Sequence, residues 1–395
     1  MPSFRSPAVC AALVVVISVA IGLAFAFKVS GKMPDFEVYW RAGQRAAAGE
    51  ALYRADDGHY QFKYLPVFAL MVSPLTRLDQ QSARAVWFVV SVVSLAMLVL
   101  ISVRLWPPVG RGFSPGVGTS PSPPAIGTWL VVLLTLIVLG KFFSRELVLG
   151  QANAMFGVIT AGAVLALSQR RERLAGALVA LGVVFKPYGL ILLPWLIARR
   201  RLSSIVTFAA GLLIAVALPL LRYDPGTVLD LHRQWWATVR DSTAPNLSNP
   251  DNVSWLAMYA RWLGEGALAR SIWLLTLAAV AAVVVWMWGR RRDVESPERL
   301  EGALLLMLVP LVSPQGWDYV LLLAAPAVVG LITHLRDQPR WLTGVSSLAM
   351  AAIGLTIYDV MGRTAYHAFM MASGITLCTF VLIAGLVGLR ARRIA

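Results

Sequence analysis

The sequence predicts an all-α protein that crosses a lipid bilayer about ten to twelve times. Hydrophobic residues make up 58% of its 395 residues and charged residues only 14%, and the mean hydropathy is +0.70. Soluble domains carry more charge and less apolar sequence. Several apolar runs also approach the roughly 20 residues that a helix needs to cross the hydrocarbon core. These runs must be helical, because lipid offers no partner for an unpaired backbone amide.

Four of the apolar runs are Val9 to Phe27, Ala83 to Leu105, Ala267 to Trp288 and Ala368 to Leu389. The first of them lacks a convincing small-residue cleavage site. It is also longer than the apolar core of a signal peptide, so we expect a helix that stays in the mature protein. All four runs are therefore predicted to be membrane-spanning helices.

Basic residues give the chain a formal charge of +15, and they cluster at the ends of apolar runs. Because they do not line one hydrophilic face, this pattern indicates membrane orientation and not nucleic-acid binding. Arginine clusters prefer the cytoplasm, so we expect all of them on one side, together with the N-terminus. The clusters are Arg170, Arg171 and Arg173; Arg199 to Arg201; Arg290 to Arg292; Arg336 and Arg340; and Arg390, Arg392 and Arg393.

This orientation divides a single integral membrane domain, residues 1–395, into loops on two sides. Residues 28–82 become the first extracytoplasmic loop and residues 222–266 a second, long one. The Pro/Gly/Ser-rich residues 107–125 become a cytoplasmic linker. The number of crossings is consistent only if Tyr64 to Leu75 does not cross. This segment is about 12 residues long, too short to span, so we expect a helix in the membrane interface.

Asp35 begins the polar part of the first outer loop, and the residues around it leave two interpretations. The loop is predicted to contain a helix parallel to the membrane, with one face formed by Phe36, Tyr39, Trp40 and Gly43. Aspartate is a favoured N-cap, and capping alone explains Asp35 at such a helix start. Alternatively, Asp35 is a general base whose acidity is tuned by partial desolvation and aromatic neighbours.

Other polar residues lie at the ends of short apolar segments. Lys186 precedes a proline between two such segments, which predicts a broken hairpin in the bilayer. A lysine at this depth either snorkels to the interface or faces an anionic partner such as a lipid phosphate. Gln151 and Asn153 lie at a helix start, just after Arg145 and Glu146. For this polar cluster, a capped and self-paired helix end is the simpler interpretation.

Two further outer segments are rich in aromatic residues. Trp317, Asp318 and Tyr319 stand at the mouth of a long apolar helix. Trp and Tyr are expected there as interfacial residues, so only the aspartate is informative. Arg233 belongs to the amphipathic stretch LHRQWWATVR of the long outer loop. Its basic and aromatic residues suit a sugar and a phosphate, but they equally suit lipid headgroups.

The sequence contains no phosphate-binding GxxxxGK[ST], no HExxH and no His/Cys spacing typical of metal ligands. Its two cysteines, Cys10 and Cys378, both fall in predicted spans, so no disulfide framework is indicated. Nucleotide-driven transport and a zinc mechanism are therefore not expected, and no cofactor is predicted.

Four segments in order resemble the membrane glycosyltransferases of the GT-C superfamily, specifically glycosyltransferase family 87, the polyprenyl-phosphate-mannose-dependent mannosyltransferases. They are DFEVYWRAG with FKYLPVFALMVSPL, then LVLGQANAMF, then FKPYGLILLPWLIARRR, then LVSPQGWDYV. The resemblance implies a GT-C fold in the inner membrane of a bacterium, whose first outer loop covers a cavity open to the extracytoplasmic side. The last segment departs from the family pattern, because Tyr319 stands where a histidine is expected.

The resemblance also implies a mechanism, in which Asp35 is the catalytic base. It would take a proton from an acceptor hydroxyl as that hydroxyl displaces polyprenyl phosphate from the sugar, with inversion. The sugar is expected to be mannose, and the acceptor a lipid-linked or cell-envelope glycan. Candidates for holding the departing phosphate are Lys186, Lys63 and Arg233. The expected substrate-binding residues are Tyr39, Gln151, Asn153, Trp317 and Asp318.

Two other classes of protein remain as alternatives. A flippase or transporter of lipids or oligosaccharides should show paired halves or charged residues deep in several helices. This chain instead concentrates its polar motifs in outer loops, which favours the transferase. A non-catalytic membrane scaffold would make Asp35 dispensable.

Overall fold

The computed structural model describes residues 22–107, 126–241 and 246–394, and these ranges are helical with no strand. Four helical segments in them are long and apolar enough to cross a membrane: α4 (Gln80–Leu105), α9 with its extension (Leu202–Leu221), α12 (Ala267–Gly289) and α18 (Gly374–Ala391). Shorter apolar helical segments cover Asn153–Ser168, Pro187–Ala198 and Asp318–Thr333. The prediction of an all-α polytopic membrane protein is therefore confirmed.

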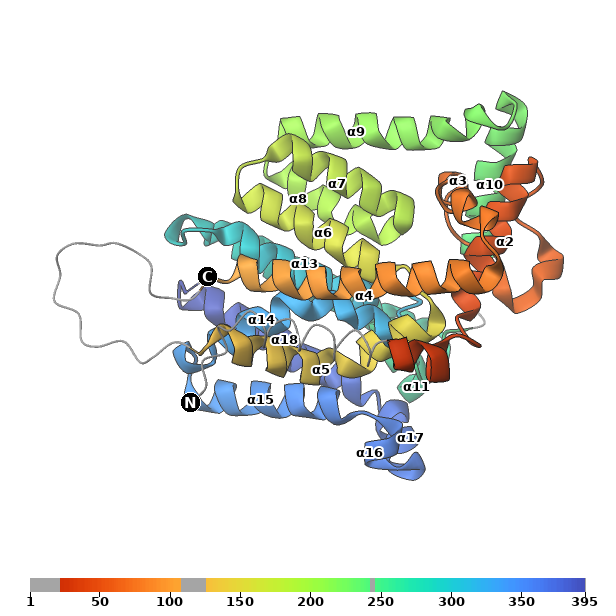
Figure 1. Cartoon of the computed structure of the whole chain (residues 1–395). Coiled ribbons are helices and arrows are strands. Elements are labelled where there is room, and N and C mark those ends of the chain that lie inside the picture. The colour runs from red at the N-terminus through yellow and green to blue at the C-terminus, as the bar shows by residue number, and fades with distance from the viewer. Residues whose placement is uncertain (1–21, 108–125, 242–245, 395) are drawn as a thin grey trace, which may run out of the picture.

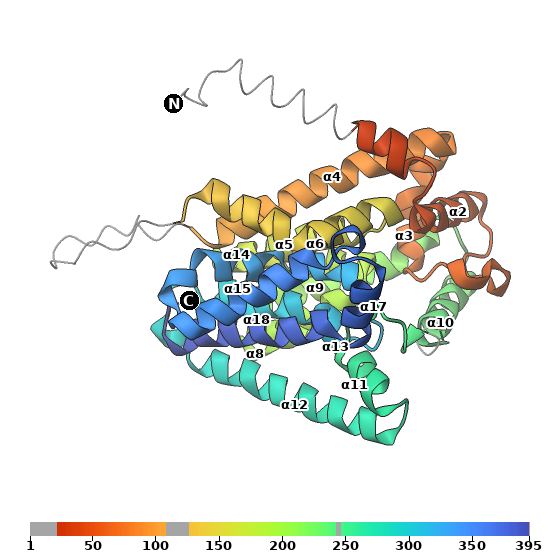
Figure 2. The ribbon, with the colours of Figure 1, turned by 90° about the horizontal axis from the view of Figure 1, so that it is seen from below.

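The long helices form one bundle and run in roughly a common direction in Figure 1, whereas Figure 2 shows α4 and α12 tilted in opposite directions on its two sides. The remaining bundle helices are α5 (Thr128–Leu149), α6 (Asn153–Ser168), α7 (Glu172–Phe185), α8 (Leu193–Ala198), α13 (Pro297–Val312), α14 (Ala325–Thr333) and α15 (Arg340–Leu355). Helices α4, α6, α7 and α9 are packed in succession, and α13 packs against α6.

The bundle has two chemically different ends. At one end, which we call the loop end, lie the short helices α2 (Pro34–Ala48), α3 (Pro66–Val72), α10 (Pro225–Asp241), α11 (Trp255–Leu263) and α17 (Arg363–Met371) (Figure 1). The opposite end, the basic end, holds arginines from several clusters in shared ion pairs. Arg201 lies 2.6 Å from Glu172 and 3.1 Å from Glu298, and Arg291 lies 2.9 Å from the same Glu298. These predicted clusters thus meet at one end.

Two predicted segments differ from the structure or fall outside it. The apolar run Ala368 to Leu389 is not one helix, because Ser373 adopts a positive φ of 61° and separates α17 from α18. Its first residues belong to α17 at the loop end, and the span begins at Gly374. Most of the first apolar run and nearly all of the linker 107–125 lie outside the described residues.

The start of α2 corrects the capping interpretation of Asp35. Pro34 is the first residue of the helix, and Met33 is the N-cap, with a left-handed φ of 63°. Proline favours this first helical position because its missing N–H would have no partner there. Asp35 is consequently the second residue of α2, where its negative charge is favourable near the helix N-terminus. The capping interpretation is therefore wrong.

A tight turn fixes α2 against the bundle. Gly150 ends α5 with a φ of 68°, a conformation that glycine adopts without strain. A side chain at this position would also place its Cβ 2.8 Å from the Cβ of Phe36. The Met33 N–H donates to the Val148 carbonyl at 3.0 Å, and the Trp87 indole donates to the Gly150 carbonyl at 2.9 Å. Asp35 therefore sits directly over the turn between α5 and α6.

Candidate active site

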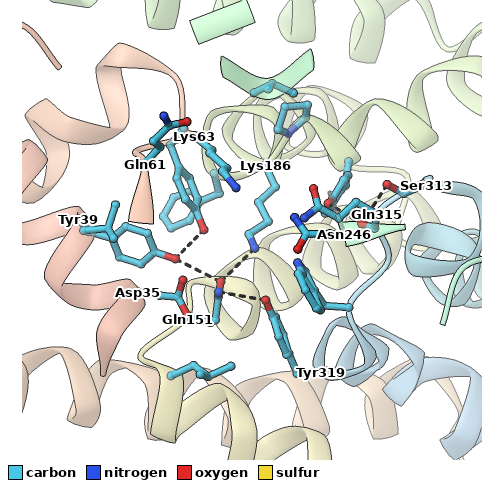
Figure 3. Close-up of a pocket in the computed structure, with 18 of the residues that line it drawn as sticks. Asp35, Tyr39, Gln61, Lys63, Gln151, Lys186, Asn246, Ser313, Gln315 and Tyr319 are labelled. Atoms are coloured by element: carbon cyan, nitrogen blue, oxygen red, sulfur yellow. Dashed lines mark hydrogen bonds between the residues drawn. The ribbon is translucent and has the colours of Figure 1, made fainter. Parts of the chain in front are cut away.

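A cavity of about 490 Å³ lies at the loop end, against the segment of residues 34–64. Its wall comes from α2, from residues 60–64, from the end of α5, from the junction after α7 and from residues 313–319 (Figure 3). The volume is within the range of small-molecule sites. Six of the nine site residues predicted from the sequence line it: Asp35, Tyr39, Lys63, Gln151, Lys186 and Trp317.

Three other predicted site residues are not among the lining residues. Asn153 is fully buried and donates to Glu146 at 2.8 Å, so that part of the polar cluster is self-paired, as its simpler interpretation required. Asp318 is also fully buried, in ion pairs described below. Arg233 is exposed on α10 and pairs with Asp230 at 3.0 Å. The structure therefore does not bring these three residues into the cavity.

Gln151 is the central hydrogen-bonding residue of the cavity. Its Oε1 accepts from the Tyr39 hydroxyl and from Lys186 Nζ, each at 3.2 Å. Its Nε2 donates to the Tyr319 hydroxyl, also at 3.2 Å (Figure 3). Tyr319, which stands where a histidine was expected from the sequence resemblance, thus lines the cavity and is hydrogen-bonded within its wall. One amide side chain connects α2, the junction after α7 and the 3₁₀ helix Asp318–Ala324 before α14.

Lys186 reaches the cavity because the following residue is proline. A proline disfavours the helical conformation of the residue before it, and Lys186 is extended, with φ −152° and ψ 134°. Helix α7 ends there, as the sequence predicted. The ammonium lies 5.6 Å from the centre of the Tyr64 ring, a cation–π contact that helps to hold a cation away from water. Figure 3 shows it directed toward the same space as the Asp35 carboxylate.

Two tyrosines border the cavity beside Asp35. The hydroxyls of Tyr39 and Tyr64 lie 2.6 Å apart, and Tyr64 is a lining residue that the sequence interpretation missed. Burial raises the pKa of both phenols well above the usual value, and the nearby Asp35 carboxylate contributes in the same direction. Both tyrosines therefore stay neutral and act as hydrogen-bonding groups.

Lys63 supplies a second cation on the loop side of the cavity. Burial lowers the pKa of its amine, and the negative charge of Asp35 opposes that change. The Trp235 indole on α10 donates to the Lys63 carbonyl at 3.2 Å, which ties α10 to this segment. Lys63 and Lys186 thus approach the cavity from two different segments, opposite Asp35 (Figure 3).

A group of four charges reaches from the cavity wall into the protein, with Lys141 and Asp318 buried and Arg145 and Asp251 partly exposed. Asp318 lies 2.9 Å from Lys141 and 2.8 Å from Arg145, and Arg145 also lies 2.9 Å from Asp251. Two cations and two carboxylates balance one another, as buried charges must. The sequence interpretation missed Lys141 and Asp251. The spacing of Lys141 and Arg145, four residues apart in an apolar helix, places both on one face and was the available signal.

The charged group holds Trp317 and Tyr319 in place. The Asp318 N–H donates to the Asp251 carbonyl at 2.9 Å, and the Val253 N–H donates to the Gly316 carbonyl at 2.7 Å. Residues 251–253 and 316–318 are thereby paired along their backbones. The rings of Trp317 and Tyr319 stack at 6.3 Å, and the Arg145 guanidinium lies 5.5 Å from the Tyr319 ring.

The cavity combines groups of complementary chemistry. One carboxylate is placed to accept a proton, two lysines are placed to bind an anion, and neutral tyrosines and an amide can orient hydroxyls. Within the described ranges, no group of three or more His, Cys, Asp or Glu side chains is placed to bind a metal ion. Such a set of groups suits a substrate that contains both an anionic and a hydroxyl-rich part.

Comparison with known proteins identifies the family. Residues 62–314, more than half of the chain, match the model of glycosyltransferase family 87. No curated protein and no solved structure matches significantly. Asp35 precedes the matched residues, so its role rests on the geometry of the cavity. The matched range contains Lys63, Gln151 and Lys186, three of the polar residues that line the cavity. The chain therefore belongs to glycosyltransferase family 87 and is a membrane glycosyltransferase.

Proposed function

We propose that the protein uses this cavity to transfer a sugar, expected to be mannose, from polyprenyl phosphate to a hydroxyl of a lipid-linked or cell-envelope glycan. Asp35 is the general base, and the reaction inverts the anomeric configuration. One observation carries the proposal: the Asp35 carboxylate shares a single cavity with the cations Lys63 and Lys186. A base for the attacking hydroxyl and cations for the departing phosphate are the two requirements of this displacement.

The proposed step balances as a single displacement. The acceptor oxygen forms a bond to the anomeric carbon while the bond from that carbon to the phosphate oxygen breaks. The acceptor proton passes to Asp35, and the electron pair of the broken bond leaves with polyprenyl phosphate. Negative charge grows on the phosphate in the transition state, where Lys186 and Lys63 stabilise it. Tyr39, Gln151 and Trp317 are proposed to orient the sugar.

The proposed location follows from the two ends of the bundle. The basic end is assigned to the cytoplasm, because arginine clusters there prevent translocation. The loop end and its cavity then face the extracytoplasmic side of a bacterial inner membrane. A polyprenyl tail would remain in the bilayer while its phosphate reaches the cavity. A lipid or oligosaccharide flippase is not favoured, because the family comprises glycosyltransferases.

The donor class is tested with the purified full-length protein in lipid nanodiscs. Radiolabelled mannose, glucose and arabinose, each on polyprenyl phosphate, are incubated with extracted envelope glycolipids as acceptors. We expect one of these donors to transfer its sugar and to release polyprenyl phosphate, and GDP-mannose alone to give no transfer. Transfer from the nucleotide sugar without a lipid carrier, or no turnover of any lipid donor, would contradict the proposal.

Replacing Lys186 by methionine should lower kcat by about 10²- to 10³-fold, the effect of removing one preorganised charge-stabilising group. Methionine keeps the length and apolar stem of the side chain but removes the charge. The matched control is Lys32→Met, since Lys32 is exposed and does not line the cavity. The two variants are compared by their initial rates of sugar transfer with saturating donor. A Lys186→Met protein that keeps the rate of the Lys32→Met control would remove Lys186 from the mechanism.

A further inference from the structure

A second cavity, of about 340 Å³, opens at the loop end beside α17. It is formed by two distant segments: residues 249–251 of the long outer loop and residues 358–367 before and within α17. No step of the proposed reaction uses it. The lining residues that matter here are Asn249, Asp251, Tyr358, Arg363, Tyr366 and His367.

Arg145 stands between the two cavities. It lines the first cavity, where its guanidinium lies 5.5 Å from the Tyr319 ring. Its Nη2 lies 2.9 Å from Oδ2 of Asp251, which lines the second cavity. One guanidinium therefore forms part of the wall of the first cavity and binds part of the wall of the second. The walls of the two cavities are therefore linked through one side chain.

The second cavity is also built on the buried charges. The Tyr366 hydroxyl accepts a hydrogen bond from Lys141 Nζ at 3.1 Å, and this lysine lies 2.9 Å from Asp318. The lysine side chain is only 7% exposed and Asp318 is fully buried. The Tyr366 hydroxyl is therefore held by a buried lysine on the side away from the cavity. Tyr358 meets Tyr366 edge to face, with ring centres 5.6 Å apart. The aromatic wall is thus held in a defined orientation.

The groups around this cavity are those that bind a sugar ring. Aromatic faces pack against the apolar C–H face of a ring, and carboxylate and amide oxygens accept hydrogen bonds from hydroxyls. Asp251 and Asn249 supply the acceptors. Arg363, whose guanidinium lies 5.7 Å from the Tyr358 ring, forms no ion pair within the described residues and supplies donors for sugar oxygens. The volume is within the range of small-molecule sites.

We propose that the second cavity binds a saccharide unit of the acceptor, one or more units away from the hydroxyl that is glycosylated. The identification of the bound saccharide as part of the acceptor rests on the proposed function, but the saccharide site itself does not. Arg145 then marks the boundary between the unit that reacts and the units that only bind. The site would give preference to acceptors that already carry several sugars.

The first test measures saccharide binding without any transfer. Full-length protein in nanodiscs is mixed with α-linked mannotriose or maltotriose, and binding is followed by saturation-transfer NMR. We expect at least one trisaccharide to bind, with equal affinity to the wild type and to Asp35→Asn. The double variant Tyr358→Ala with Arg363→Ala should weaken this binding at least tenfold. Both side chains are exposed, so the fold should survive their removal.

The second test compares acceptor lengths in the transfer assay. For a trisaccharide acceptor, the double variant should raise KM about tenfold at unchanged kcat, whereas KM for a monosaccharide and for the donor should stay the same. The matched control is Trp236→Ala with Arg270→Ala, one exposed aromatic and one exposed arginine that line neither cavity. This control should behave as the wild type in both tests.

The outcomes separate the two proposals. Trisaccharide binding that the double variant loses, together with no transfer from any donor, would leave the saccharide site standing and reject the proposed function. Failure of both trisaccharides to bind, or equal losses in the double variant and its control, would overturn the saccharide site. The saccharide site would also be overturned if the double variant bound the trisaccharides as the wild type does and lost only its binding to anionic lipid vesicles. The two residues would then contact lipid headgroups.

Discussion

Replacing Asp35 by asparagine should lower the rate of sugar transfer by about 10²- to 10⁴-fold, the usual contribution of a general base. Asparagine keeps the size of the side chain but cannot take the proton of the acceptor hydroxyl. The fold should survive, because the carboxylate is half-buried in the first turn of α2. Removing a charge at that place costs about 0.3–1 kcal/mol. Rates are measured with saturating donor and acceptor.

Glu37→Gln is the matched control for this variant. Glu37 belongs to the same first turn of α2 and has the same charge, but it pairs with Arg41 and with Arg84 outside the cavity. We expect its rate to stay within a factor of about two of the wild type, in line with the small energies of exposed ion pairs. Equal rates for Asp35→Asn and Glu37→Gln would remove Asp35 from the chemistry.

Replacing Asp318 by asparagine should destabilise the protein by about 3–5 kcal/mol, the cost of leaving buried charges without their partner. Asp318 is fully buried and is within 3 Å of both Lys141 and Arg145. Its loss leaves Lys141 without a carboxylate partner among the described residues. The expected result is a marked fall in the midpoint of thermal unfolding in detergent.

Asp251→Asn is the control for stability. Its side chain is 29% exposed and contacts only Arg145 of the two cations, so about 0–1 kcal/mol is expected. If Asp318→Asn unfolds at the same temperature as the wild type but loses affinity for the donor, Asp318 contacts substrate, as the sequence interpretation had it. The buried contacts predict the opposite pattern.

The fold class was predictable because it depends on properties that are local in the sequence. Apolar run length gives the spans, and the arginine clusters give a common end. The break at Lys186 follows from the next residue being proline. The buried face of α2 was also predictable, since Phe36 and Tyr39 recur at helical spacing. The incorrect assignment of Asp35 as the N-cap could also have been avoided. The preceding residue, Pro34, is a proline, and proline favours the first helical position.

The interior of the candidate site was less predictable, because it depends on segments far apart in the sequence. Gln151 contacts Tyr39 and Tyr319, which lie 112 and 168 residues away. The partners of Lys141 and Arg145 likewise come from other helices and loops. Residue type alone placed Arg233 among the phosphate ligands, but a charge on an exposed helix face carries no information about its distance from a cavity.

The proposed single displacement at Asp35 is tested most directly by the anomeric configuration of the product. A donor with a β-linked sugar on polyprenyl phosphate is converted by the wild-type protein, and the new glycosidic bond is examined by NMR. We expect an α-linked product, because the acceptor attacks from the face opposite the departing phosphate. A β-linked product would contradict it, since retention requires two displacements and a nucleophile in place of a base.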